Sequence, residues 1–285
     1  MNKYKDKWFY FEILVGSMII FGLVYVYLDH MINQYWLRNI DYPFSVVIFQ
    51  GQFFSFFTYQ SNFMVAIFLL LSGIFYKKKL AFCKSQTILL AITSYITVTC
   101  VTYTFILFPS ILFSHKPIKP LDMVGGTFFH MISPPLMIFY CVKHIDLSEI
   151  TKKSYFTKSF ILYLIYPWLY TLFLLGRLIM YTVDFKFTDV PIEIIYPYSP
   201  FFDYNSKSLN HFMSEIINLI LSVIVFFVSV HILFITFNLI YFFSFKKMAN
   251  KKALNNTLTQ NENLNLKNRV VNKSKKVNTK QKQKE

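Results

Sequence analysis

The sequence predicts an all-α integral membrane protein, a bundle of six transmembrane helices with both termini in the cytoplasm. Three observations lead to this prediction. Only 15% of the 285 residues are charged, while 55% are hydrophobic and 20% aromatic; soluble domains carry about 25% charged residues. The apolar residues gather into runs that are long enough to cross a bilayer, which takes about 20 residues of helix. Lysine and arginine are concentrated in alternate segments between these runs and in the tail.

Six apolar runs form the predicted spans. They are residues 8–29, 50–76, 87–109, 124–143, 159–181 and 214–243. Helices are expected because a helix satisfies every backbone polar group within its own segment. The runs are too long and continuous for barrel strands, which alternate over about 10 residues. The first run follows a basic start and ends without a small-residue cleavage site, so we expect it to remain as a membrane helix rather than to be removed as a signal peptide.

The distribution of Lys and Arg orients these spans. The N-terminal segment has three, the segments after the second and fourth spans have four each, and the C-terminal tail has 12. The segments after the first, third and fifth spans have one, two and two. Because basic residues mark cytoplasmic segments, both termini are expected on the cytoplasmic side of the cell membrane.

The C-terminal tail, residues 246–285, is rich in Lys, Asn and Gln and has no apolar periodicity. Such a segment cannot bury enough apolar surface to fold alone, so we expect disorder. Its charge can attract anionic lipid; the simpler interpretation is a solvated tail that helps to fix the topology. The net charge of +15 is accounted for by the loops and this tail, so no specific nucleic-acid partner is expected.

Motifs typical of soluble enzymes are missing. The sequence has no GxGxxG, P-loop, GxSxG or HExxH pattern. Cys83, Cys100 and Cys141 lack CxxC spacing, and the histidines match no zinc-ligand pattern, so neither a metal nor a cofactor is expected. Any chemistry must therefore come from polar side chains within the spans, where they are costly and hence candidates for function.

The second predicted span carries a small, polar helix face. Gly51, Ser55, Thr58, Asn62 and Ala66 recur at steps of three or four residues and so share one side of a helix. One interpretation is a packing stripe, since small residues let membrane helices approach closely. The other is that Thr58 and Asn62 belong to a functional site.

The fourth predicted span carries His130 on one face with Gly126 and Ser133. Pro134 lacks an N–H group and so frees the carbonyl of His130, which can bend the helix. His130 lies eight residues past Asp122, or about 12 Å along a helix, and Thr58 lies six residues past Gln52, or about 9 Å. Both spans enter from the outer side, so the two side chains are expected at a similar depth.

A Thr–His pair has a recognisable chemistry. A threonine hydroxyl is a weak nucleophile that a neutral imidazole can activate as a base. Asn62, one turn beyond Thr58, can donate a hydrogen bond to a developing oxyanion. A buried Thr–His hydrogen bond without any reaction is the alternative.

Arg177 lies near the outer end of the fifth predicted span. Its guanidinium can hold the carboxylate or phosphate of a lipid that enters from the outer leaflet. The alternative is that it extends to the membrane surface or pairs with a nearby carboxylate.

Three stretches together resemble a known family. FFSFFTYQSNFMVAI (53–67) resembles the YFT-x-x-SN helix of the bacterial six-pass Pr-six-Pr membrane family; the His130 span with Pro134 resembles its fourth helix; YPWLYTLFLLGR (166–177) and YPYSPFFD (196–203) resemble its ending. That family is similar to the androgen-induced-gene and androgen-dependent TFPI-regulating proteins, six-pass hydrolases of fatty-acid esters. The resemblance implies a Thr58 nucleophile and a His130 base. The order Gly176-Arg177 and the inserted Ser199 depart from the family pattern.

The sequence therefore leads to two functional hypotheses. The first is an intramembrane Thr–His hydrolase of a lipid ester, open to the outer leaflet, with membrane lipids and a hydrophobic ester as its partners. The second is a non-catalytic lipid- or small-molecule-binding membrane protein or a transporter.

Overall fold

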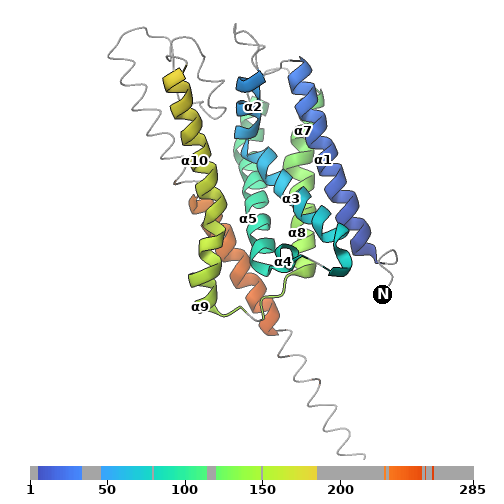
Figure 1. The fold of residues 1–285 in the computed structure, drawn as a ribbon. Helices are drawn as coiled ribbons and strands as arrows, with labels where there is room; N and C mark the ends of the chain where they lie inside the picture. The colour runs from blue at the N-terminus through green and yellow to red at the C-terminus, as the bar shows by residue number, and fades with distance from the viewer. Residues whose placement is uncertain are drawn as a thin grey trace, which may run out of the picture.

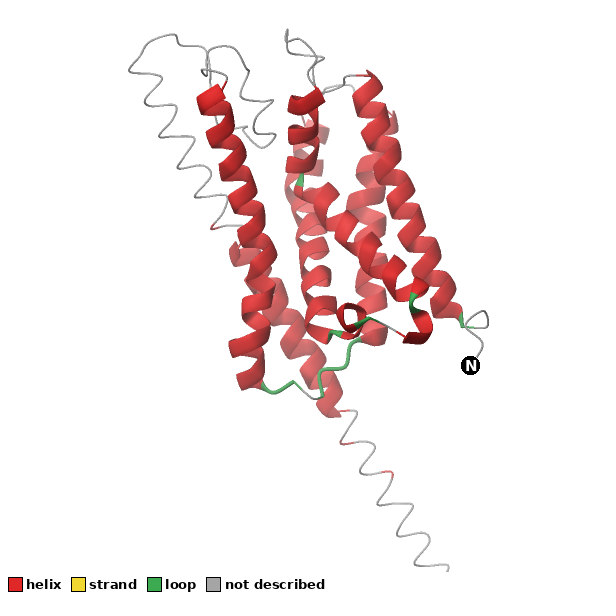
Figure 2. Ribbon diagram, in the orientation of Figure 1, coloured by secondary structure: helices red, strands yellow, loops and turns green. Residues whose placement is uncertain are grey.

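The computed structural model describes residues 6–33, 46–78, 80–113, 120–148, 150–184, 228, 231–251, 254 and 259. All regular structure within these residues is helical, with no strand (Figure 2). Five helices in this part of the chain are long and apolar enough to cross a membrane. They are Lys7–Asn33, Phe57–Ile74, Gln86–Phe105, Val124–His144 and His231–Lys251. The prediction of an all-helical protein is confirmed for the described residues, and these five helices have the length and composition that membrane spans require.

The remaining predicted span, 159–181, coincides with α10 (Phe160–Asp184), a helix of 25 residues that is not one of these five. Its crossing of the membrane, and with it the number six, stays a prediction. Residues 214–227 of the last predicted span lie outside the described residues. The helix of this span continues to Lys251, past the predicted start of the disordered tail at 246. This helix is linked to the segment after α8, because Lys246 Nζ donates to the carbonyls of Leu147 and Ser148 at 2.8 and 2.9 Å.

Of the first four predicted spans, only the first is a single regular α-helix, α1 (Lys7–Asn33). The second is divided at Phe56 into α2 (Val46–Ser55) and α3 (Phe57–Ile74). The third comprises α5 (Gln86–Thr102), the π-helical turn η4 (Tyr103–Leu107) and α6 (Phe108–Phe113). The fourth comprises α7 (Pro120–Thr127), the π-helical turn η5 (Phe128–Ile132) and α8 (Ser133–His144). The short elements are η3 (Tyr76–Lys78), α4 (Ala81–Lys84), α9 (Lys152–Ser154) and the π-helical η6 (Tyr155–Ser159).

The long helices stand side by side as a bundle (Figure 1). α1 packs along α3, α3 packs on α5, and α5 packs on both α8 and α10. The start of α1, α4, α9 and the end of the 231–251 helix all lie at one end of this bundle (Figure 1). We call it the lysine end, because the exposed lysines Lys7, Lys77, Lys78, Lys84, Lys152, Lys153 and Lys247 belong to these segments or directly adjoin them.

Close contact between α1 and α3 depends on glycine. A Cβ atom on Gly16 would lie 3.2 Å from the carbonyl oxygen of Ala66, and one on Gly73 would lie 2.7 Å from Cδ1 of Ile13. Small residues at such crossings let membrane helices pack closely. Glu12 is fully buried in α1 and accepts a hydrogen bond of 2.6 Å from the Tyr140 hydroxyl of α8.

Candidate active site

The interruption of the helix at Phe56 places Thr58 in the first turn of α3. Phe56 has an extended ψ of 115°, which interrupts the helical hydrogen bonds between α2 and α3. Side chains take over the carbonyls at the end of α2: Gln60 Nε2 donates to Phe54 O at 2.5 Å and the Tyr170 hydroxyl donates to Ser55 O at 2.7 Å. The break is therefore a built feature of the fold, because the freed polar groups have partners.

Thr58 and His130 are in direct contact. Thr58 Oγ1 lies 2.9 Å from His130 Nε2, and His130 Nδ1 lies 2.7 Å from the carbonyl oxygen of Gly126. A carbonyl oxygen can only accept, so Nδ1 carries a proton. In neutral imidazole the other nitrogen is then the acceptor, and the Thr58 hydroxyl donates to Nε2. This is the arrangement of a nucleophile, a base and a group that orients the base, with Gly126 O as the orienting group.

The π-helical turn around His130 exposes a backbone carbonyl toward α3. The N–H of Ser133 donates to Phe128 O, five residues back, and Pro134 has no N–H to give. The carbonyl of Phe129 is thus left without the donors that a helix would supply. Asn62 Nδ2 donates to it at 3.1 Å and also to Thr58 O at 2.8 Å. One amide therefore joins the turn that carries Thr58 to the turn that carries His130.

Asn62 was expected to donate to an oxyanion, but in the structure it donates to backbone carbonyls. Both N–H groups of its amide point to backbone carbonyls, so neither is directed at a developing oxyanion in this arrangement. Asn62 is completely buried, and its Oδ1 has no hydrogen-bond partner among the described residues.

The other predicted site residues fall in different places. Arg177 lies in α10, but its side chain is outside the described part of the structure. Ser133 is buried in the first turn of α8. Tyr103, which the sequence analysis did not identify, stacks on the His130 ring with centroids 3.9 Å apart and an interplanar angle of 18°. In a chain that is 20% aromatic, no spacing distinguishes this tyrosine from its neighbours.

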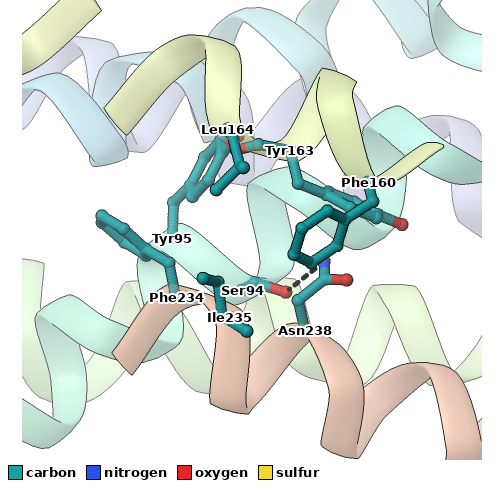
Figure 3. Close-up of a pocket in the computed structure, with 8 residues that line it drawn as sticks. All are labelled: Ser94, Tyr95, Phe160, Tyr163, Leu164, Phe234, Ile235 and Asn238. Carbon is teal, nitrogen blue, oxygen red and sulfur yellow. Dashed lines mark hydrogen bonds between the residues drawn. The ribbon is translucent and has the colours of Figure 1, made fainter. Parts of the chain in front are cut away.

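The Thr58 side of the site is buried, while His130 is partly exposed. Thr58 is only 9% exposed, and the neighbouring Ser61 hydroxyl lies 2.8 Å from Thr99 Oγ1 on α5. A small cavity elsewhere, about 10 Å³ in volume, is lined by residues of α5, α10 and the 231–251 helix (Figure 3). Neither Thr58 nor His130 lines it; its polar wall is the hydrogen bond of 3.2 Å from Asn238 to Ser94. Its size suits one water molecule.

No family model matches the chain, and neither a curated protein nor a solved structure matches it. Within the described residues, no group of three or more His, Cys, Asp or Glu side chains is placed to hold a metal ion.

Proposed function

We propose that this chain is a six-pass membrane hydrolase in which Thr58 and His130 cleave a lipid ester. The observation that carries the proposal is the hydrogen bond of 2.9 Å between Thr58 Oγ1 and His130 Nε2, with Nδ1 held on Gly126 O at 2.7 Å. A hydroxyl beside a correctly oriented base is the minimum needed for covalent catalysis. The resemblance to the Pr-six-Pr family and to intramembrane Thr–His hydrolases agrees with this assignment.

The reaction follows from the positions of the protons. Thr58 Oγ1 attacks the ester carbonyl carbon while His130 Nε2 takes the hydroxyl proton, which gives a tetrahedral oxyanion. The C–O bond to the alcohol breaks, and Nε2 returns the proton to the departing alkoxide. Water then attacks the acyl-threonine, Nε2 again takes and returns a proton, and the carboxylic acid leaves with Thr58 restored. The hydrogen bond from Nδ1 to Gly126 O keeps Nε2 available throughout.

The start of α3 offers stabilisation for the oxyanion. The first N–H groups of a helix have no acceptor within the helix, and the positive end of the helix dipole favours negative charge there. The N–H groups of Tyr59 and Gln60 donate to Phe56 O at 3.1 and 3.3 Å. The N–H groups of Phe57 and Thr58 are the remaining donors of this turn, and we assign them the role first expected of Asn62.

The proposed substrate is a hydrophobic ester drawn from the outer leaflet of the cell membrane. Arg177, near the end of α10 that is remote from the lysine end, is proposed to bind the acidic headgroup of such a lipid. The proposed topology places the lysine end and both termini in the cytoplasm. Residues 246–285 then lie beside the inner leaflet, where their charge adds attraction to anionic lipid.

The topology can be tested by accessibility in intact cells. Single cysteines at Lys78 and at His115, in a background that lacks the three native cysteines, are expected to react differently with a membrane-impermeant maleimide. Position 115 should label in intact cells and position 78 only after permeabilisation, because basic loops stay in the cytoplasm. Equal labelling of both positions would contradict the proposed orientation.

The proposed activity is tested with purified protein, a fluorophosphonate probe and a panel of fatty-acid esters. We expect stoichiometric labelling of the protein by the probe and release of the carboxylic acid from at least one ester class. Absence of both would favour the second hypothesis, a non-catalytic lipid- or small-molecule-binding protein or a transporter. The 9% exposure of Thr58 is the observation that favours this alternative, since a buried Thr–His bond can serve packing alone.

A further inference from the structure

The contacts around the His130 imidazole extend beyond the two hydrogen bonds that define its tautomer. The Tyr103 ring lies almost parallel to it, with centroids 3.9 Å apart. Tyr103 is 7% exposed, so its ring is packed among protein side chains. We infer that Tyr103 is a positioning residue that keeps the His130 imidazole in the plane from which Nε2 faces Thr58. This inference rests on the proposed hydrolase function.

The two hydrogen bonds hold the ring only while both of them are made. A histidine ring turns about a soft terminal torsion with broad minima, and both of its hydrogen bonds lie near the ring plane. Rotation about that torsion breaks both hydrogen bonds together, and the Tyr103 ring blocks one direction of this rotation. A displacement of about 1 Å at a catalytic group can reduce a rate about 100-fold.

Gly126 contacts both His130 and Tyr103 and so contributes to the orientation of the imidazole. Its carbonyl accepts from His130 Nδ1, and a Cβ atom at this position would lie 2.9 Å from the Tyr103 hydroxyl oxygen and 3.6 Å from its Cζ. The Tyr103 hydroxyl therefore occupies the place that a side chain at residue 126 would need. Glycine at 126 and tyrosine at 103 are coupled sterically, and the coupling acts on the group that orients the base.

Both partners lie on π-helical turns, and these turns contact each other. Tyr103 begins η4 and His130 is the middle residue of η5. A π-helical turn inserts an extra residue and redirects the side chains that follow, and such turns occur frequently at functional sites. The tyrosine ring lies over the imidazole where the two turns meet.

The test combines four variants of the full chain with two readouts. The variants are Tyr103→Leu, Tyr103→Phe, Gly126→Ala and the double variant Gly126→Ala/Tyr103→Phe. Phe108→Leu is the matched control, because Phe108 contacts Tyr103 at a centroid distance of 5.9 Å and lies in the same segment. The readouts are kcat and KM on the cleaved ester, and the ¹⁵N spectrum of His130 in histidine-labelled protein, assigned by difference from His130→Asn.

We expect Tyr103→Leu to lower kcat by about 30-fold with KM within about two-fold, because the ring orientation and not substrate binding is lost. Its ¹⁵N spectrum should show mixed tautomers in place of one Nδ1–H form. Tyr103→Phe and Phe108→Leu should resemble the wild type. Gly126→Ala should lose activity, and the double variant should regain it, because removal of the hydroxyl makes room for the new methyl group.

Three results would overturn the inference: a single Nδ1–H tautomer in Tyr103→Leu, an unchanged kcat in that variant, or no recovery in the double variant. If Tyr103→Leu does not fold, the comparison of Gly126→Ala with the double variant still tests the inference. If the wild type cleaves no ester, the proposed function fails, and the spectrum alone then shows whether Tyr103 orients the imidazole.

Discussion

Thr58→Val is expected to abolish ester cleavage and labelling by the fluorophosphonate probe while the protein stays folded. Valine keeps the shape of threonine and replaces the hydroxyl with a methyl group, so the attacking oxygen is removed from its position 2.9 Å from His130 Nε2. Loss of a nucleophile in a hydroxyl–imidazole system lowers kcat by about 1,000-fold or more. The measurement is the initial rate of acid release at saturating ester, with protein quantified by size-exclusion chromatography.

Thr93→Val provides the matched control for this experiment. Thr93 is fully buried in α5, and its hydroxyl donates to Leu89 O in the same helix at 2.7 Å. The same chemical change there should leave the rate within about three-fold, because ordinary buried substitutions act on stability rather than on the reacting atoms. Thr58→Ser should keep activity. Turnover by Thr58→Val at the wild-type rate would exclude Thr58 as the nucleophile.

Asn62→Asp is expected to have the largest effect on stability. The Asn62 amide donates to the carbonyls of Thr58 and Phe129 in a fully buried place. A carboxylate has no N–H group to donate, so its oxygen would face two carbonyl oxygens that are also acceptors. A protonated acid has one O–H group and could donate to only one of the two carbonyls. Leaving buried polar groups without partners costs about 1–3 kcal/mol for each group. We expect a loss of about 3 kcal/mol in the free energy of unfolding by that measure, read from denaturation in mixed micelles.

The control for this variant is Asn250→Asp, the same change at an exposed position of the 231–251 helix. Surface substitutions of this kind stay within about 0.5 kcal/mol. Equal stability of Asn62→Asp and the wild type would show that the amide does not tie α3 to the π-helical turn.

The site was partly predictable from the sequence. Thr58 was identified because polar residues in a membrane span are costly, and His130 because an imidazole in hydrocarbon requires a partner. The spacing from the outer ends of the two spans suggested a similar depth, and the structure brings the two side chains within hydrogen-bond distance. Pro134 correctly indicated a disturbed helix at His130, because it withholds a backbone donor.

What the sequence did not predict depends on contacts between helices. In the π-helical turn at Phe128–Ile132, the carbonyl of Phe129 accepts its hydrogen bond from Asn62 on α3. Periodicity within one span contains no information about such a partner. The break at Phe56 likewise depends on Gln60 and Tyr170 as donors to the end of α2. For the same reason the sequence did not reveal that the Asn62 amide donates to two backbone carbonyls.

The central claim is that Thr58 carries the acyl group during turnover, and mass spectrometry tests it most directly. The protein is mixed with excess ester, quenched in acid within the first turnovers, and digested. We expect an adduct with the mass of the acyl group on Thr58, which disappears on longer incubation with water and never forms in His130→Ala. Cleavage of the ester with no adduct at Thr58, or with the acyl group on another residue, would contradict it.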